Sequence, residues 1–197
     1  MNEEITNTTN NYKAIVIGAS AGGLHVLIEL FKNLPIDYPL PIIVVQHRSK
    51  EPNDLLEEVL QPKCLIKIKQ ADEKERIENG TIYIAPPDYH LMVERDMTFS
   101  LAHDEPVKYS RPSIDVLFES AAAVFKNTLV GIILTGTNSD GAEGIKTIFE
   151  YGGLTIVQSP NESQFPVMPL ASIATKKVKY IWTLEKIADF LLMLNKV

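Results

Sequence analysis

Runs of apolar residues alternate along the chain with segments in which apolar residues recur every three or four positions. The runs at 14–18 and 41–47 are rich in β-branched residues, a pattern typical of strands buried on both faces of a parallel sheet. Between these runs, apolar residues recur at helical spacing: Leu24, Leu27, Ile28, Leu30 and Phe31. This part of the chain therefore predicts a β-α-β crossover.

The same alternation continues to the C-terminus. Apolar runs predict further strands at 65–69, 81–87, 129–136, 154–159 and 179–184. Helical spacing and terminal signals predict helices at 52–60, 113–127, 141–151 and 184–195. Two short segments on either side of Arg95-Asp96 predict an antiparallel β-hairpin: 90–94 and 97–102.

These elements predict one α/β domain over 12–197. It is expected to have three layers and a doubly wound, mostly parallel sheet, with the antiparallel β-hairpin as an insertion. The stretch 1–11 has no apolar period and is expected to be a disordered N-terminal tail. A chain of 197 residues with 45% hydrophobic residues is long enough for one sizeable core and short for two.

Charge and composition exclude several classes of function. The net charge is −6 and no run of Lys or Arg is longer than Lys176-Lys177, which argues against a nucleic-acid partner. The single cysteine, Cys64, cannot form an internal disulfide, and no apolar stretch has the roughly 18 residues of a membrane span. Together with the lack of a leader sequence, these features predict a cytoplasmic protein without membrane insertion.

Three chemically reactive residues follow predicted strands. Ser20, in the sequence G-A-S-A-G, comes directly after the first strand, His47 ends the second, and Asp140 lies in the loop after 129–136. Ligands of open parallel sheets bind outside the carboxyl ends of the strands. With the common strand order 3-2-1-4-5, all three loops meet above one edge of the sheet.

Ser20, His47 and Asp140 are the residue types of a serine hydrolase. Serine is a poor nucleophile at neutral pH and needs a nearby base, together with a third group that orients the base. The backbone N–H of Ala21, at the start of a helix, could stabilise an oxyanion. The chain order Ser, His, Asp differs from that of α/β-hydrolases, in which the histidine comes last, because no histidine follows His103.

Each of these residues also has a structural interpretation. Ser20 could cap the following helix, Asp140 could form a capping box with Glu143, and His47 could be a hydrogen-bonded histidine at a strand end. A glycine-rich phosphate loop is a further alternative, although Ser20 stands where G-x-G-x-x-G requires its second glycine. No metal site is predicted, because no set of candidate ligands has a clear spacing.

Several stretches of the chain together resemble the catalytic domain of the CheB family, the chemotaxis protein-glutamate methylesterases. They are, in order, IGASAGGL, VVQHR, IYIAPPDYHLMVE, SRPSIDVLFESAA, GIILTGTNSDGAEGI and VMPLASI. The resemblance implies hydrolysis of glutamate γ-methyl esters on chemoreceptors, often with glutamine deamidation, by a catalytic triad of Ser20, His47 and Asp140. It implies no metal or organic cofactor. The implied partners are methylated chemoreceptor helices or another methylated protein.

The resemblance also suggests auxiliary residues around the triad. The backbone N–H groups of Ala21 and Thr137 would stabilise the oxyanion. Arg48, His90 and Arg111 would lie at the rim of the substrate site.

The chain departs from the family pattern close to the expected triad. Ala21 stands where a hydroxyl residue often follows the nucleophile, Arg48 replaces a common methionine, and 137–141 reads T-N-S-D-G instead of M-G-N-D-G. The short tail leaves no room for the receiver domain of the best-known members, so activation by a phosphorelay within this chain is not expected. These departures leave open a non-catalytic or differently targeted module that binds a helical signalling partner.

Overall fold

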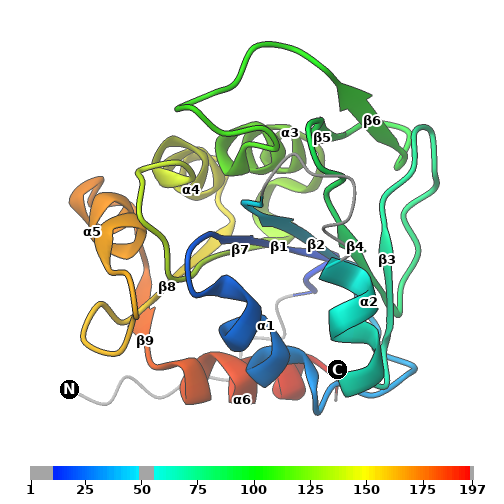
Figure 1. Ribbon diagram of the computed structural model, residues 1–197, viewed down its shortest axis with the longest axis horizontal. Coiled ribbons are helices and arrows are strands. Elements are labelled where there is room, and N and C mark those ends of the chain that lie inside the picture. Colours follow the sequence, from blue (N-terminus) through cyan, green and yellow to red (C-terminus); the bar gives the residue numbers. More distant parts are fainter. Residues whose placement is uncertain (1–10, 49–55, 196–197) are drawn as a thin grey trace.

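Seven strands form one sheet in the computed structural model, which describes residues 11–48 and 56–195. They are β1 Ala14–Ala19, β2 Ile42–Gln46, β3 Lys67–Gln70, β4 Thr81–Ile84, β7 Leu129–Ile133, β8 Leu154–Gln158 and β9 Tyr180–Trp182. The order across the sheet is β3-β4-β2-β1-β7-β8-β9, and every adjacent pair is parallel (Figure 1). The predicted parallel sheet is confirmed, and β7 flanks β1 as the assumed strand order required.

A two-stranded hairpin stands outside this sheet. β5 (His90–Val93) pairs antiparallel with β6 (Phe99–Ala102). The hairpin packs against helix α3 (Ile114–Phe125) beside one edge of the sheet (Figure 1). The predicted antiparallel insertion is therefore also confirmed.

Helices cover both faces of the sheet (Figure 1). One face carries α1 (Gly23–Phe31), α2 (Leu56–Leu60) and α6 (Leu184–Leu194); the other carries α3, α4 (Ala142–Glu150) and α5 (Val167–Ala174). Short 3-10 turns follow two of the helices: η1 Gln61–Lys63 and η2 Lys126–Thr128. No helix within the described ranges is long and apolar enough to cross a membrane.

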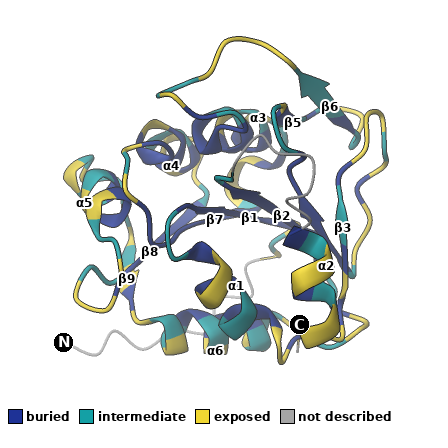
Figure 2. Cartoon of the chain, in the orientation of Figure 1, coloured by how far each residue is buried: buried dark blue, intermediate teal, exposed yellow. Residues whose placement is uncertain are grey.

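Strand β1 lies at the centre of the core because helices cover both of its faces. All of its residues are buried, as are those of β2, β7 and β8 (Figure 2). Ile15 and Ile17 pack in the layer of α1 and α6, whereas Ala14 and Val16 pack in the layer of α3. This packing fixes the C-terminal end of β1, which leads directly into Ser20.

The structure adds one helix and shortens several strands relative to the sequence-based prediction, among them the strand predicted at 81–87, which ends at Ile84. The pattern assigns no helix to 167–174, where α5 forms although it contains Pro169. The strand predicted at 129–136 ends at Ile133, and the Thr135 N–H donates to the side chain of Gln158 in β8 instead of to a backbone carbonyl. The predicted tail, apart from Asn11, and the start of the predicted helix at 52–60 lie outside the described residues.

Candidate active site

The ends of β1 and β2 bring Ser20 and His47 side by side. The last residues of the two strands pair with each other, and the His47 N–H donates to the Ala19 carbonyl at 2.9 Å. On the other side, the Ser20 N–H donates to the Thr135 carbonyl, beyond β7, at 3.0 Å. Ser20 and His47 line the same surface hollow, which has a volume of about 590 Å³. The candidate nucleophile and base thus share one carboxyl edge of the sheet.

The turn from β1 into α1 depends on Gly22. This residue has a left-handed conformation (φ 77°), forms the N-cap of α1 and leaves the helix without a side-chain cap. Glycine adopts such a conformation without steric cost, whereas a Cβ here would also lie 2.8 Å from Gln164 Oε1. The interpretation of Ser20 as the helix cap is therefore wrong, and its hydroxyl is not used by α1.

Gly23 has no room for a side chain, because a Cβ would lie 1.8 Å from Gln46 Oε1. Gln46 is held in place, since its Nε2 donates to the carbonyls of Ser20 and His47, both at 2.8 Å.

We expect Gly23→Ala to displace Gln46, lower the free energy of unfolding by about 1–3 kcal/mol and reduce turnover. Urea unfolding and turnover assays would measure these changes. Gly152→Ala, at a left-handed glycine far along the chain, is the control and should lower stability alone; equal loss of turnover in both variants would contradict the prediction.

Asp140 is fully buried and uses both carboxylate oxygens as hydrogen-bond acceptors. Oδ2 accepts from His47 Nε2 at 2.8 Å and from the Ile114 N–H at 2.7 Å. Oδ1 accepts from Ser113 Oγ at 2.9 Å and from the Asp115 N–H at 3.1 Å. Two of these donors are the first amides of α3, where the helix dipole favours negative charge. Asp140 therefore connects the candidate base to the N-terminus of α3.

The expected capping box at α4 does not form. The N-cap of α4 is Gly141, which has no side chain to act as a cap, and the Gly144 N–H of the first turn donates to Asp115 Oδ1 at 2.7 Å rather than to Asp140. Asp140 does stabilise a helix terminus, but the helix is α3, whose N-cap residue Ser113 also bonds to the Asp140 carboxylate. The capping-box interpretation of Asp140 and Glu143 is therefore wrong.

The hydrogen bonds around Asp140 determine which nitrogen of His47 is basic. Burial raises the pKa of Asp140, but the bonds from His47 and from the α3 amides outweigh burial and hold this pKa below its usual range. An ionised carboxylate can only accept hydrogen bonds, so His47 Nε2 carries the proton in this contact. In the neutral imidazole, Nδ1 is then the acceptor nitrogen.

Two side chains that the sequence analysis did not select face His47 Nδ1. Ser110 Oγ and Asn138 Nδ2 each lie 3.5 Å from this nitrogen, and Asn138 Nδ2 donates to Ser110 Oγ at 3.1 Å. Both residues lie in stretches that carry the family resemblance. The residue type of a loop serine or asparagine does not indicate which side chain it will contact. Only the motifs shared with the family could have drawn attention to Ser110 and Asn138.

The two backbone groups expected to stabilise an oxyanion occupy different settings. Ala21 lines the hollow beside Ser20, at the N-terminal end of α1. Thr137 is exposed in the loop between β7 and α4. Within the described residues neither N–H donates a hydrogen bond, so both stay predicted oxyanion donors.

The arginines expected at the substrate rim are held by other parts of the protein. The Arg48 side chain is 4% exposed, and its guanidinium donates to the Ala85 carbonyl at 3.1 Å. The Arg111 side chain is 9% exposed and forms an ion pair with Asp88 at 2.7 Å. Both guanidinium groups connect loops, so the expectation that they present charge at an open rim is corrected.

His90 does not lie at the rim either, because it is only 2% exposed. Its Nδ1 accepts from the Ser113 N–H at 3.2 Å, and its Nε2 lies 3.1 Å from the Glu105 carbonyl, to which it donates. His90 therefore supports the segment that leads into α3, one residue from the amides that bond Asp140.

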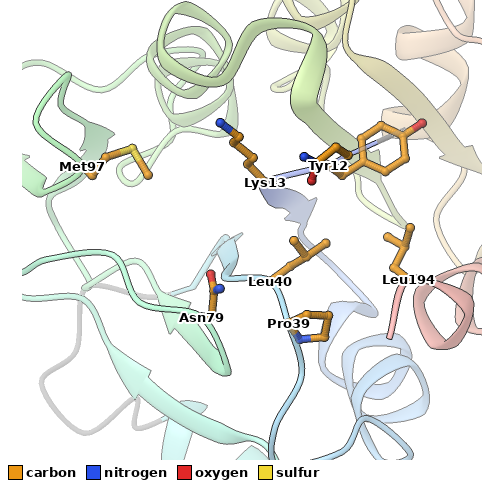
Figure 3. A pocket seen from close by; sticks show the side chains of 8 residues that line it. Tyr12, Lys13, Pro39, Leu40, Asn79, Met97 and Leu194 are labelled. Carbon is orange, nitrogen blue, oxygen red and sulfur yellow. The ribbon is translucent and has the colours of Figure 1, made fainter. Parts of the chain in front are cut away.

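A second hollow, of about 420 Å³, lies at the other end of β1, near Tyr12, Lys13, Leu40 and Leu194 (Figure 3). None of the predicted site residues lines it. Among the described residues, no group of three or more His, Cys, Asp or Glu side chains could hold a metal ion.

Known proteins match almost the whole chain. The family model described as CheB methylesterase matches residues 15–191. A putative protein-glutamate methylesterase/protein-glutamine glutaminase of Leptospira interrogans is 47% identical over 94% of this chain and 96% of its own length. A protein-glutamate methylesterase/protein-glutamine glutaminase of Clostridium acetobutylicum is 33% identical over 92% of this chain, which spans 53% of that protein. The crystal structure of the Thermotoga maritima CheB methylesterase catalytic domain has a TM-score of 0.89 and 31% identity, covering 93% of this chain and 98% of that one.

Proposed function

Because the chain belongs to the CheB methylesterase family, we propose that it hydrolyses glutamate γ-methyl esters on the cytoplasmic helices of chemoreceptors. Deamidation of glutamine at similar sites is a second proposed reaction. The observation that carries the proposal is the 2.8 Å contact between His47 Nε2 and buried Asp140, formed beside the Ser20 turn. This contact supports an active hydrolase rather than a binding module, because it orients a base next to a hydroxyl.

The proposed reaction has two steps. Ser20 Oγ attacks the ester carbonyl while His47 Nδ1 accepts the hydroxyl proton; the N–H groups of Ala21 and Thr137 stabilise the oxyanion, helped by the positive end of α1. His47 then gives this proton to the methoxide, and methanol leaves a γ-glutamyl ester on Ser20. A water molecule, deprotonated by His47, attacks this ester, and the returned proton regenerates Ser20. Asp140 keeps the imidazole oriented throughout.

Methanol release from methylated chemoreceptor fragments tests this activity. The purified wild-type chain should release methanol and convert each methylated glutamate into glutamate, as read by mass spectrometry of the fragment. The same fragment without methyl groups is the control and should release none. A folded chain that leaves the methylated fragment unchanged would contradict the proposed function.

We expect His47→Gln to lower kcat for methanol release by about four to six orders of magnitude, because glutamine cannot accept the serine proton. Initial-rate measurements on the methylated fragment would determine the loss. His103→Gln is a matched control, since this exposed histidine contacts Asp88 and neither Ser20 nor Asp140. Similar rates for His47→Gln and wild type would assign the base to another group.

A further inference from the structure

The acceptor nitrogen of His47 is surrounded by hydrogen-bond donors in the protein alone. Ser110 Oγ and Asn138 Nδ2 approach Nδ1 from two separate loops, one between β6 and α3 and one between β7 and α4. Over the described ranges, no hydrogen bond links the Ser20 hydroxyl to this ring. The two loops therefore meet at the nitrogen that the proposed reaction uses.

The orientation of the Asn138 amide follows from its other contacts. Its Oδ1 accepts from the Asp140 N–H at 3.1 Å, so its NH₂ group is directed toward Ser110 and His47. One N–H donates to Ser110 Oγ, which leaves the Ser110 hydroxyl proton available to His47 Nδ1. Both side chains can thus act as donors, which matches the acceptor state that Asp140 imposes on Nδ1.

The loop that carries Ser110 is fixed on both sides. The backbones of Val107 and Ser110 exchange hydrogen bonds of 3.1 and 2.8 Å. Lys108 Nζ bonds to Asp115 Oδ2 at 2.8 Å and to the Ser139 carbonyl at 3.1 Å. Lys108 therefore ties this loop to α3 and to the loop that carries Asn138.

We propose that Ser110 and Asn138 form a positioning pair that holds the Nδ1 edge of His47, so that the imidazole is fixed from both ring nitrogens until the Ser20 hydroxyl replaces the pair as the donor to Nδ1. The proposal rests on the proposed function, in which His47 is the base. The contact with Asp140 alone would leave the ring free to pivot about Nε2, whereas contacts at Nδ1 restrict this motion. Asn138 stands where the M-G-N-D-G pattern has glycine, so this chain has an amide side chain at a position where the pattern has none.

Kinetics of Ser110→Ala, Asn138→Ala and the double variant test the pair. Each single variant should lower kcat about 10-fold to 100-fold with KM nearly unchanged. The kcat of the double variant should be no lower than the kcat of the more impaired single variant, because the pair acts as a unit. Ser110→Thr should retain most of the activity, and Ser139→Ala, at an exposed serine of the same loop, all of it. Fully additive losses, or unchanged kcat in both single variants, would overturn the proposal.

Nitrogen NMR of the His47 ring gives a test that needs no substrate. Loss of the donors should shift the resonance of the unprotonated ring nitrogen downfield in the double variant, while the Nε2–H resonance is retained. Unchanged ring resonances would overturn the pair even if methanol is released. If wild type released no methanol, the proposed function would fail, but the ring resonances would still decide whether Ser110 and Asn138 hold His47.

Discussion

Ser20→Ala is expected to lower kcat for methanol release by about four to six orders of magnitude, because the proposed mechanism has no other group that attacks the ester. The fold should be unaffected. Ser20 contributes to the fold through its backbone, whose N–H donates to Thr135 and whose carbonyl accepts from Gln46. Initial rates with the methylated fragment and thermal unfolding of the same preparation would measure the two quantities.

A matched control for this variant is Ser100→Ala, in the β5–β6 hairpin, where the hydroxyl bonds to Glu94 and not to the triad. This control should retain wild-type turnover. If Ser20→Ala kept measurable activity close to that of Ser100→Ala, the nucleophile would not be Ser20. A serine-directed phosphonate should also label wild type at Ser20 and fail to label Ser20→Ala.

Asp140→Ala is expected to have the second-largest effect, and to affect both stability and turnover. Removing the carboxylate leaves buried donors of Ser113, Ile114 and Asp115 without their acceptor, which we expect to cost about 3–5 kcal/mol of unfolding free energy. It also frees the His47 ring, and we expect kcat to fall by about four orders of magnitude. Urea unfolding and methanol release would measure these losses.

The pH dependence of this stability loss follows from the lowered pKa of Asp140. A carboxyl whose pKa is lower in the folded than in the unfolded state stabilises the fold above its unfolded pKa, and this contribution disappears as pH falls through the folded pKa. The difference in unfolding free energy between wild type and Asp140→Ala should therefore shrink toward acid pH.

Asp140→Asn separates the role of Asp140 in capping α3 from its role in orienting His47. An unchanged rate of methanol release in this variant would assign Asp140 to α3 capping alone.

The central architecture could be predicted from the sequence because it depends on local apolar pattern. Continuous β-branched runs identified β1 and β2, and short crossovers predicted that they would be neighbours. The positions of Ser20 and His47 followed from this arrangement, since each residue comes directly after its strand. The adjacency of Asp140 followed only from an assumed strand order; the structure confirms its β1–β7 pairing, but it places β4 rather than β3 beside β2.

Side-chain partners that are distant in the sequence could not be predicted in the same way. Arg48 and Arg111 have the charge expected of a substrate rim, but their carbonyl and carboxylate partners lie on other loops. The backbone amides of Ile114 and Asp115 cannot be identified as hydrogen-bond donors to Asp140 from their residue types. Helix α3 brings them to Asp140 only in the completed fold. The sequence thus predicted the location of Ser20, His47 and Asp140 better than it predicted the groups that hold their neighbours.

The single carboxylate of Asp140 joins parts of the chain that are distant in the sequence. Its donors come from β2's end, from α3 and from the segment before α3, so the base is oriented only when these parts have come together. A partly folded chain with an exposed serine and a loose imidazole would lack this orientation. Under the proposed mechanism, a newly made or damaged chain would therefore not hydrolyse surrounding esters until these parts are in place.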